Sequence, residues 1–306
     1  MTADWPLIAV RFALYGTLSG LFGLSAFALS SLNDGERRSV LPLRPWLVGG
    51  GVAAALLSCI ALALLAAAMV GAPAWPIDRE AIAMLLSGSA TGTAWLVRMI
   101  ALILASLAAM MVPRRRFAVH GVMLGSGVAL ATLAWTGHGA MDEGGRGWVH
   151  LGADILHLLA AGGWMGALIG LGLLVARSGN RVDSTHVALT HRALHGFASM
   201  GTVLVGTILA TGIINGAMLI GIGGLGAVPV TLYGQLLLAK LALFGAMLGL
   251  AALNRFRLTP ALPDATEPRI ALHALRRSLA IETACAIAIL ALVAWLGTLE
   301  PPTGGI

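Results

Sequence analysis

Charged residues are scarce in this chain of 306 residues: they make up 10% of it, against 58% hydrophobic residues. A soluble globular domain carries about 25% charged residues, so this composition and a mean hydropathy of +0.90 exclude an ordinary water-soluble fold. Cysteine is also scarce, since Cys59 and Cys285 each lie alone in an apolar run, which excludes a disulfide framework and a thiolate metal cluster. The lipid bilayer is therefore the predicted solvent.

Three further absences narrow the function. The opening MTADWPLIAV lacks the basic region and cleavage site of a signal peptide, so we expect the first apolar run to be retained as a helix. The sequence contains no GxxxxGK[ST] loop, and no nucleophile and base stand in a recognised catalytic spacing, so we expect neither ATP-driven transport nor an enzyme. The net charge of +6 comes from arginines at the ends of apolar runs, where they set topology, and nucleic-acid binding is not expected.

Eight apolar stretches are long enough to cross a bilayer, which takes about 20 helical residues. They cover residues 7–32, 46–70, 93–112, 117–137, 150–176, 194–216, 234–254 and 277–298. A weaker run at 77–90 predicts a surface helix or a re-entrant segment, and we favour the surface helix. The predicted fold is thus all-α, a single polytopic membrane domain over residues 1–306 with eight transmembrane helices.

Loop arginines predict the orientation, because cytoplasmic loops are enriched in Lys and Arg. The first, third, fifth and seventh loops carry nearly all of them: Arg37, Arg38, Arg44, Arg114, Arg115, Arg116, Arg177, Arg181, Arg192, Arg255, Arg257, Arg269, Arg276 and Arg277. The second and fourth loops hold one each, and the glycine-rich sixth loop holds none. The odd loops are therefore predicted to be cytoplasmic and both termini periplasmic.

Glycines recur at every fourth position in three of the spans. The spacing lets two helix backbones touch, and it occurs at Gly16 and Gly20, at Gly162, Gly166 and Gly170, and at Gly245 and Gly249. We therefore expect the fifth and seventh spans to lie at the centre of the bundle.

Ionisable residues inside a span are costly and mark either a function or a charge pair. Counting about 1.5 Å per residue, one layer near the outer boundary collects Arg11, Arg98, Lys240, Asp154 and His157. On the fifth span, His150, Asp154 and His157 follow an H-x3-D-x2-H pattern, which places them on one helix face. Two imidazoles and a carboxylate suit copper in either oxidation state, or another borderline metal.

Additional donors lie just before this span, in the turn TGHGAMDEGGRGWVH. The predicted metal site therefore consists of His150, His157, His138, Asp154 and Met141. Trp164, deeper on the same span, is expected to line the wall of that site. The alternative is structural: Asp154 neutralises Lys240 or Arg98, and the histidines form hydrogen bonds at the membrane interface.

A candidate inner site lies near the cytoplasmic ends of three spans. His120 and His195 begin the fourth and sixth spans, and Glu282 lies about one turn into the eighth. The alternative is that Glu282 pairs with a loop arginine. His191 falls in a predicted loop and is expected to be solvated.

Five stretches of the sequence are distinctive. They read TGTAWLVRMIALIL at 91–104, HLGADILHLLAAGGWMGALIGLGLL at 150–174, LVGTILATGIINGA at 204–217, TLYGQLLLAKLALFGAMLGLAALNRFR at 231–257 and LRRSLAIETACAIAILALVAWLGTLEPP at 275–302. Together they resemble the copper resistance protein D (CopD) family over most of the chain. The family's characteristic positions fall on His150, His157, Trp164, Asn215, Tyr233, Lys240, Asn254 and Glu282.

The resemblance implies an inner-membrane protein of a Gram-negative envelope that takes up periplasmic copper. It also implies a small periplasmic copper carrier, CopC, as the donor, which we expect to be a separate protein. Two alternatives stay open: a copper-delivery assembly factor without net transport, and a b-type cytochrome. In the cytochrome, His138 with His157, or His120 with His195, would hold haem iron.

Overall fold

The computed structural model is helical, and the residues it describes contain no β-strand. These residues are 4–39, 43–71, 73–112, 114–115, 117–137, 144–176, 184–221, 223–260 and 268–302. Eight helices are long and apolar enough to cross a membrane, which confirms the predicted all-α polytopic fold. They are α1 (Trp5–Ser31), α3 (Leu43–Val70), α5 (Ala90–Met111), α6 (Ala118–Ala131) with the 3-10 turn η1 (Thr132–Thr136), α7 (Gly144–Val175), α8 (Ser184–Leu219), α9 (Leu232–Leu253) with the π turn η5 (Asn254–Leu258), and α10 (Pro268–Leu296).

Each predicted span overlaps one of these helices, but three helices begin six or more residues before the predicted apolar runs. Helices α7, α8 and α10 begin at Gly144, Ser184 and Pro268. Hydropathy detects only the lipid-compatible part of a helix, whereas backbone hydrogen bonds continue through polar turns such as STHVALTH. The early starts place the polar residues of these helices deeper along their axes than the apolar runs predicted.

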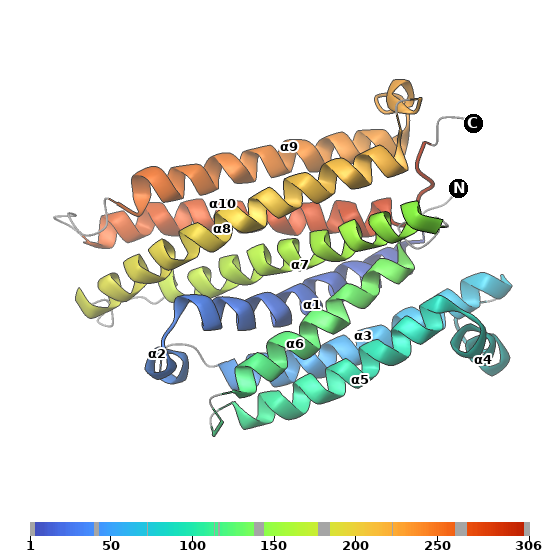
Figure 1. Cartoon of the computed structure of the whole chain (residues 1–306), viewed down its shortest axis with the longest axis horizontal. Coiled ribbons are helices and arrows are strands. Elements are labelled where there is room, and N and C mark those ends of the chain that lie inside the picture. Colours follow the sequence, from blue (N-terminus) through green and yellow to red (C-terminus); the bar gives the residue numbers. More distant parts are fainter. Residues whose placement is uncertain are drawn as a thin grey trace.

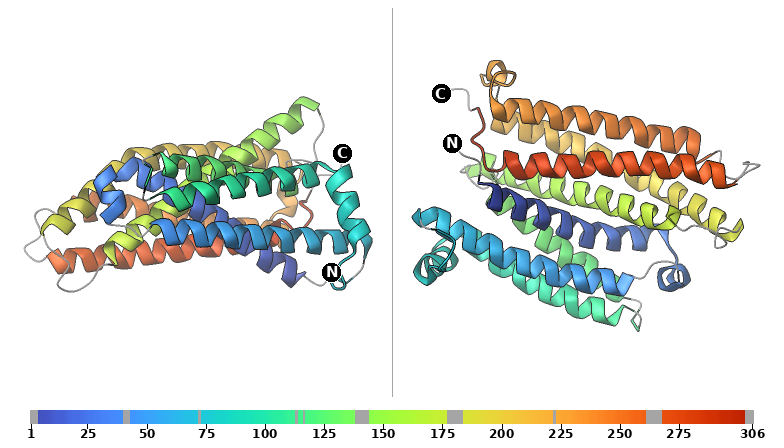
Figure 2. Two further views of the ribbon diagram at one scale, coloured as in Figure 1. Left: turned by 90° about the horizontal axis from the view of Figure 1, so that it is seen from below. Right: turned by 180° about the vertical axis from the view of Figure 1, so that it is seen from behind.

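The long helices run alternately up and down, and the N- and C-terminal ends of the chain lie at the same end of the bundle (Figure 1). We call this the terminal end, and the other the opposite end. Helix α1 packs against α3, α6, α7, α8 and α10. Helices α3, α5 and α6 lie on one side of it and α8, α9 and α10 on the other (Figure 2). Helix α8 packs on α7, and α9 packs on α10.

The segment at 77–90 forms the short helix α4 (Arg79–Gly88), whose first turn is capped by Asp78. It lies across the ends of α3 and α5 at the terminal end (Figure 2). Its Ala81 and Leu85 are buried in a small apolar cluster with Leu62 and Ala66 of α3. This is the arrangement of a surface helix rather than of a segment that re-enters the bundle.

Closely packed glycines join α1 to α7. A methyl group added at Gly166 would overlap the backbone of Gly23, and one added at Gly170 would overlap the ring of Phe27. Helix α7 is accordingly the most enclosed span, with 67% of its apolar window buried. The expectation that the seventh span is central was wrong. In α9, 6% of the apolar window is buried, and Gly245 and Gly249 have open space beside them. Glycine spacing creates a flat helix face, but it does not determine whether another helix covers that face.

Candidate functional site

Helix α7 directs its histidine face into the bundle. His150 is buried, with 1% of its surface exposed. About two turns further along α7, His157 Nδ1 lies 2.9 Å from Thr211 Oγ1 on α8. The Thr211 hydroxyl also donates to the carbonyl of Thr207 at 2.6 Å, so its own proton is used within α8. With that proton engaged, the Thr211 oxygen accepts from His157 Nδ1, which leaves Nε2 as the nitrogen with a lone pair.

Asp154 lies between the two histidines, in a polar cluster shared by three helices. Its Oδ1 accepts a hydrogen bond of 2.6 Å from Asn215 Nδ2 on α8. Lys240 and Tyr233 of α9 both interact electrostatically with Asp154, and Lys240 also acts on His157. We call Asp154, His157, Thr211, Asn215, Tyr233 and Lys240 the α7–α9 polar cluster. All six residues lie within the distinctive sequence stretches quoted above, and all but Thr211 were named there individually.

The predicted five-ligand metal site is not assembled by the described residues alone. His150 and His157 are seven residues apart, which is about 10.5 Å along a helix axis. In the part of the chain that the structure describes, no group of three or more His, Cys, Asp or Glu side chains is arranged to hold a metal ion. His138 and Met141 lie outside the described residues. The described donors are therefore spaced along one helix face instead of surrounding one point.

The predicted layer of charged residues is divided among three places. Lys240 lies with Asp154, as above. Arg98 of α5 is buried and donates from Nε to Thr132 Oγ1 at 2.8 Å and from Nη2 to the Thr132 carbonyl at 3.3 Å. The guanidinium of Arg11 on α1 packs against Gly297, just beyond α10. The predicted equal depth thus did not bring these residues together, and the counter-charge of Asp154 is Lys240 rather than Arg98.

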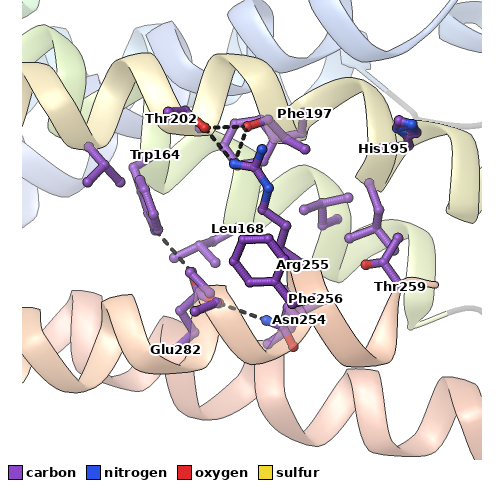
Figure 3. Close-up of a pocket in the computed structure, with 18 of the residues that line it drawn as sticks. Trp164, Leu168, His195, Phe197, Thr202, Asn254, Arg255, Phe256, Thr259 and Glu282 are labelled. Atoms are coloured by element: carbon purple, nitrogen blue, oxygen red, sulfur yellow. Dashed lines mark hydrogen bonds between the residues drawn. The ribbon is translucent and has the colours of Figure 1, made fainter. Parts of the chain in front are cut away.

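A second cluster, which we call the Glu282 triad, lies deeper in the bundle. Glu282 of α10 accepts hydrogen bonds from Trp164 Nε1 of α7 at 3.1 Å and from Asn254 Nδ2 of η5 at 3.0 Å (Figure 3). Glu282 is 3% exposed. The ring nitrogen of Trp164 thus contacts Glu282, and its expected place in the wall of the histidine site stays a prediction. The suggested pairing of Glu282 with a loop arginine was wrong, since both of its oxygens accept from neutral donors.

Helix α10 begins at Pro268, so Glu282 lies about 21 Å along its axis from that first residue. The π turn brings Asn254 to the same depth, because η5 continues α9 directly and turns Asn254 inward, where it is 6% exposed. Such π segments are frequent at functional sites. Spans that are separate in the sequence therefore meet at one buried carboxylate.

The Glu282 triad forms part of the wall of a pocket of about 650 Å³ between α8 and η5, with α7 and α10 behind it. His195 lines the same pocket, but Figure 3 shows it well away from Glu282. His120 is exposed on α6, which packs against α1, α5 and α7. The structure thus does not bring Glu282, His120 and His195 together as one inner site.

Sequence reasoning missed His191, which also lines the pocket. It had been assigned to a loop because the apolar run begins later, at about residue 194, whereas α8 begins at Ser184. The available signal was the H-x3-H spacing of His191 and His195, which places both rings on one face of any helix that contains them.

Comparison with known proteins covers nearly the whole chain. Residues 1–148 match the family model "Copper resistance protein D-like, N-terminal domain", and residues 191–296 match the model "Copper resistance protein D". The chain is 46% identical over 303 residues to a protein of Pseudomonas syringae pv. tomato named "Copper resistance protein D", with 96% of each chain covered. No solved structure matches it.

Proposed function

The chain belongs to the copper resistance protein D family, and from that premise we propose that it takes up periplasmic copper and transfers it across the bacterial inner membrane. Its family and its eight apolar helices make it a multi-pass membrane protein with a copper-related function. The proposal adds a direction, a route and a set of residues. Copper is the cargo in this scheme, and the protein supplies binding without catalysis.

The observation that carries the proposal is the histidine face of α7. This helix is the most enclosed of the eight, and it turns His150, Asp154 and His157 inward from the terminal end. Neutral imidazoles spaced along a buried helix face offer successive binding positions to a soft cation. Since the inner spans are apolar, such positions are the places where a metal ion finds ligands that replace its water.

The charge of the polar cluster favours a monovalent cargo. The ammonium group of Lys240 faces Asp154 and also acts on His157, so the carboxylate of the cluster is already paired and does not compensate the charge of an entering metal ion. The cost of taking an uncompensated charge out of water rises with that charge, so it is larger for a divalent ion. Cu(I) is therefore the species we propose to pass, with His138 and Met141 as further donors at the entrance.

The orientation is part of the proposal. The terminal end faces the periplasm, where a separate carrier of the CopC type delivers copper, and the opposite end faces the cytoplasm. The arginine-rich loops predict this orientation. Transfer follows the copper gradient or a cytoplasmic sink.

Copper uptake into vesicles tests the proposal. Right-side-out vesicles that contain wild-type protein or His150→Ala/His157→Ala are incubated with external radioactive Cu(I) under reducing conditions. The matched control is His273→Ala, because His273 is an exposed histidine on α10 outside the pocket. We expect the double variant to lose uptake and the control to retain it. Equal uptake in the wild type and in vesicles without the protein would instead favour an assembly factor without net transport.

A further inference from the structure

Two histidines face each other on α8 at the opposite end of the bundle from His150. His191 and His195 are one helical turn apart, and their ring centres lie 6.2 Å from each other at an interplanar angle of 78°. Both rings line the pocket between α8 and η5. His191 is half-buried and His195 is exposed, so the pair lies at the mouth of the pocket rather than in its interior.

The spacing of the rings matches a shared metal ion. A metal lies about 2 Å from a ligating imidazole nitrogen, and the ring centre lies about 1 Å beyond that nitrogen. Two imidazoles that bind one ion from opposite sides therefore have ring centres about 6 Å apart, whereas a tetrahedral angle brings them to about 5 Å. The separation of 6.2 Å leaves room for one ion between the two rings.

We propose that His191 and His195 form a second copper site, one that binds Cu(I) between two imidazoles at the mouth of the pocket. The choice of copper rests on the proposed function. In that scheme the pair receives the ion on the far side of the membrane from His150 and releases it to the cytoplasm.

Neighbouring charges favour a monovalent ion here as well. Arg192, between the two histidines in the sequence, is engaged in an ion pair with Glu36 of the short helix α2 (Asp34–Ser39). Arg255 of η5 donates to the Ala198 carbonyl at 3.1 Å and to Thr202 Oγ1 at 2.5 Å, one to two turns further along α8 (Figure 3). The charge of Arg192 is therefore compensated, whereas Arg255 lines the pocket, and its positive charge penalises a divalent ion more than a monovalent one.

The pocket itself provides the approach to this site. Apart from the Glu282 triad and Arg255, much of its wall is apolar, including Leu168, Leu194, Phe197 and Leu248. Trp164 and Phe197 meet edge to face, with ring centres 6.4 Å apart. A soft cation that arrives through the bundle therefore meets Glu282 and aromatic faces first, and imidazole nitrogens at the exit.

Equilibrium binding tests the second site without any transport measurement. The full chain, purified in detergent under anaerobic reducing conditions, is titrated with Cu(I) against the chromophoric competitor bicinchoninate. We expect His191→Ala/His195→Ala to lose about one bound Cu(I) per chain relative to the wild type and to His273→Ala. The same loss is expected in a His150→Ala/His157→Ala background, since the two pairs lie at opposite ends of the bundle. X-ray absorption of that background is expected to show Cu(I) with two nitrogen neighbours.

Unchanged Cu(I) stoichiometry and affinity in His191→Ala/His195→Ala would overturn the second site. If that variant does not fold, His191→Cys/His195→Cys replaces it, because thiolates are strong Cu(I) ligands at the same positions; absence of copper–sulfur scattering there would also overturn the proposal. The proposed function is tested separately, by the vesicle uptake of His150→Ala/His157→Ala. A failure of the proposed function can therefore be distinguished from a failure of the second site.

Discussion

Replacing Gly166 by alanine tests the contact that holds the histidine helix in place. Gly166 of α7 lies against Gly23 of α1, and the added methyl group would overlap the backbone of Gly23 and the amide nitrogen of Leu24. Non-bonded carbon atoms approach to about 3.5–4.0 Å, so the two helices would have to separate by about 1.5 Å or more. Forcing one extra carbon into such a contact costs about 1–3 kcal/mol of folding free energy.

Gly172 on the same helix provides the matched control. A methyl group added there meets no atom within 4 Å. Alanine is favoured over glycine inside a helix by up to about 1 kcal/mol, and nothing opposes that gain at this position. The same substitution at two positions of one helix is therefore expected to have opposite signs: destabilising at Gly166 and neutral or stabilising at Gly172.

Thermal unfolding of the purified protein in one detergent measures both effects. One kcal/mol shifts the midpoint by about 2–4 °C in proteins of 150–250 residues, so Gly166→Ala is expected to lower Tm by several degrees. A Gly166→Ala midpoint equal to that of the wild type, or an equal loss in Gly172→Ala, would refute the close α1–α7 contact. Copper binding by His150 and His157 is expected to weaken in Gly166→Ala, because α7 must shift to accommodate the methyl group.

Two further substitutions test the buried polar clusters. Glu282→Leu leaves Trp164 Nε1 and the Asn254 amide without their acceptor, so we expect a destabilisation of about 1–3 kcal/mol and a shift in tryptophan emission. Glu282→Gln keeps an acceptor oxygen and is expected to lose less stability. Equal losses of stability in the two variants would argue against the triad. Lys240→Met leaves Asp154 without its counter-charge, and because both side chains are half-buried, we expect a loss between the roughly 1 kcal/mol of an exposed pair and the about 3–5 kcal/mol of a buried one. Lys240→Met/Asp154→Asn is expected to recover much of that loss. Additive losses in that double variant, measured by thermal unfolding, would show that the two charges do not interact.

Features that depend on position along one helix could be predicted from the sequence. Hydropathy counts the apolar residues in a window, and the bilayer requires about 20 of them, so the eight spans followed from composition. The H-x3-D-x2-H pattern placed His150, Asp154 and His157 on one face because helix geometry is the same in every context. The resemblance likewise rested on local motifs, and the family comparisons confirmed it over nearly the whole chain.

Features that depend on which helices meet were decided by the tertiary structure alone. Asp154 accepts a hydrogen bond from Asn215, which is 61 residues away in the sequence, and Trp164 donates one to Glu282, which is 118 residues away. In lipid, apolar faces do not distinguish a neighbouring helix from the acyl chains around it, so helix pairing depends on close backbone contact and on polar partners. This is why the central position of α7 followed from glycines that meet Gly23, whereas the glycines of α9 faced open space. The order of residues along one helix face was readable from the sequence, but the neighbours of that face were set by packing.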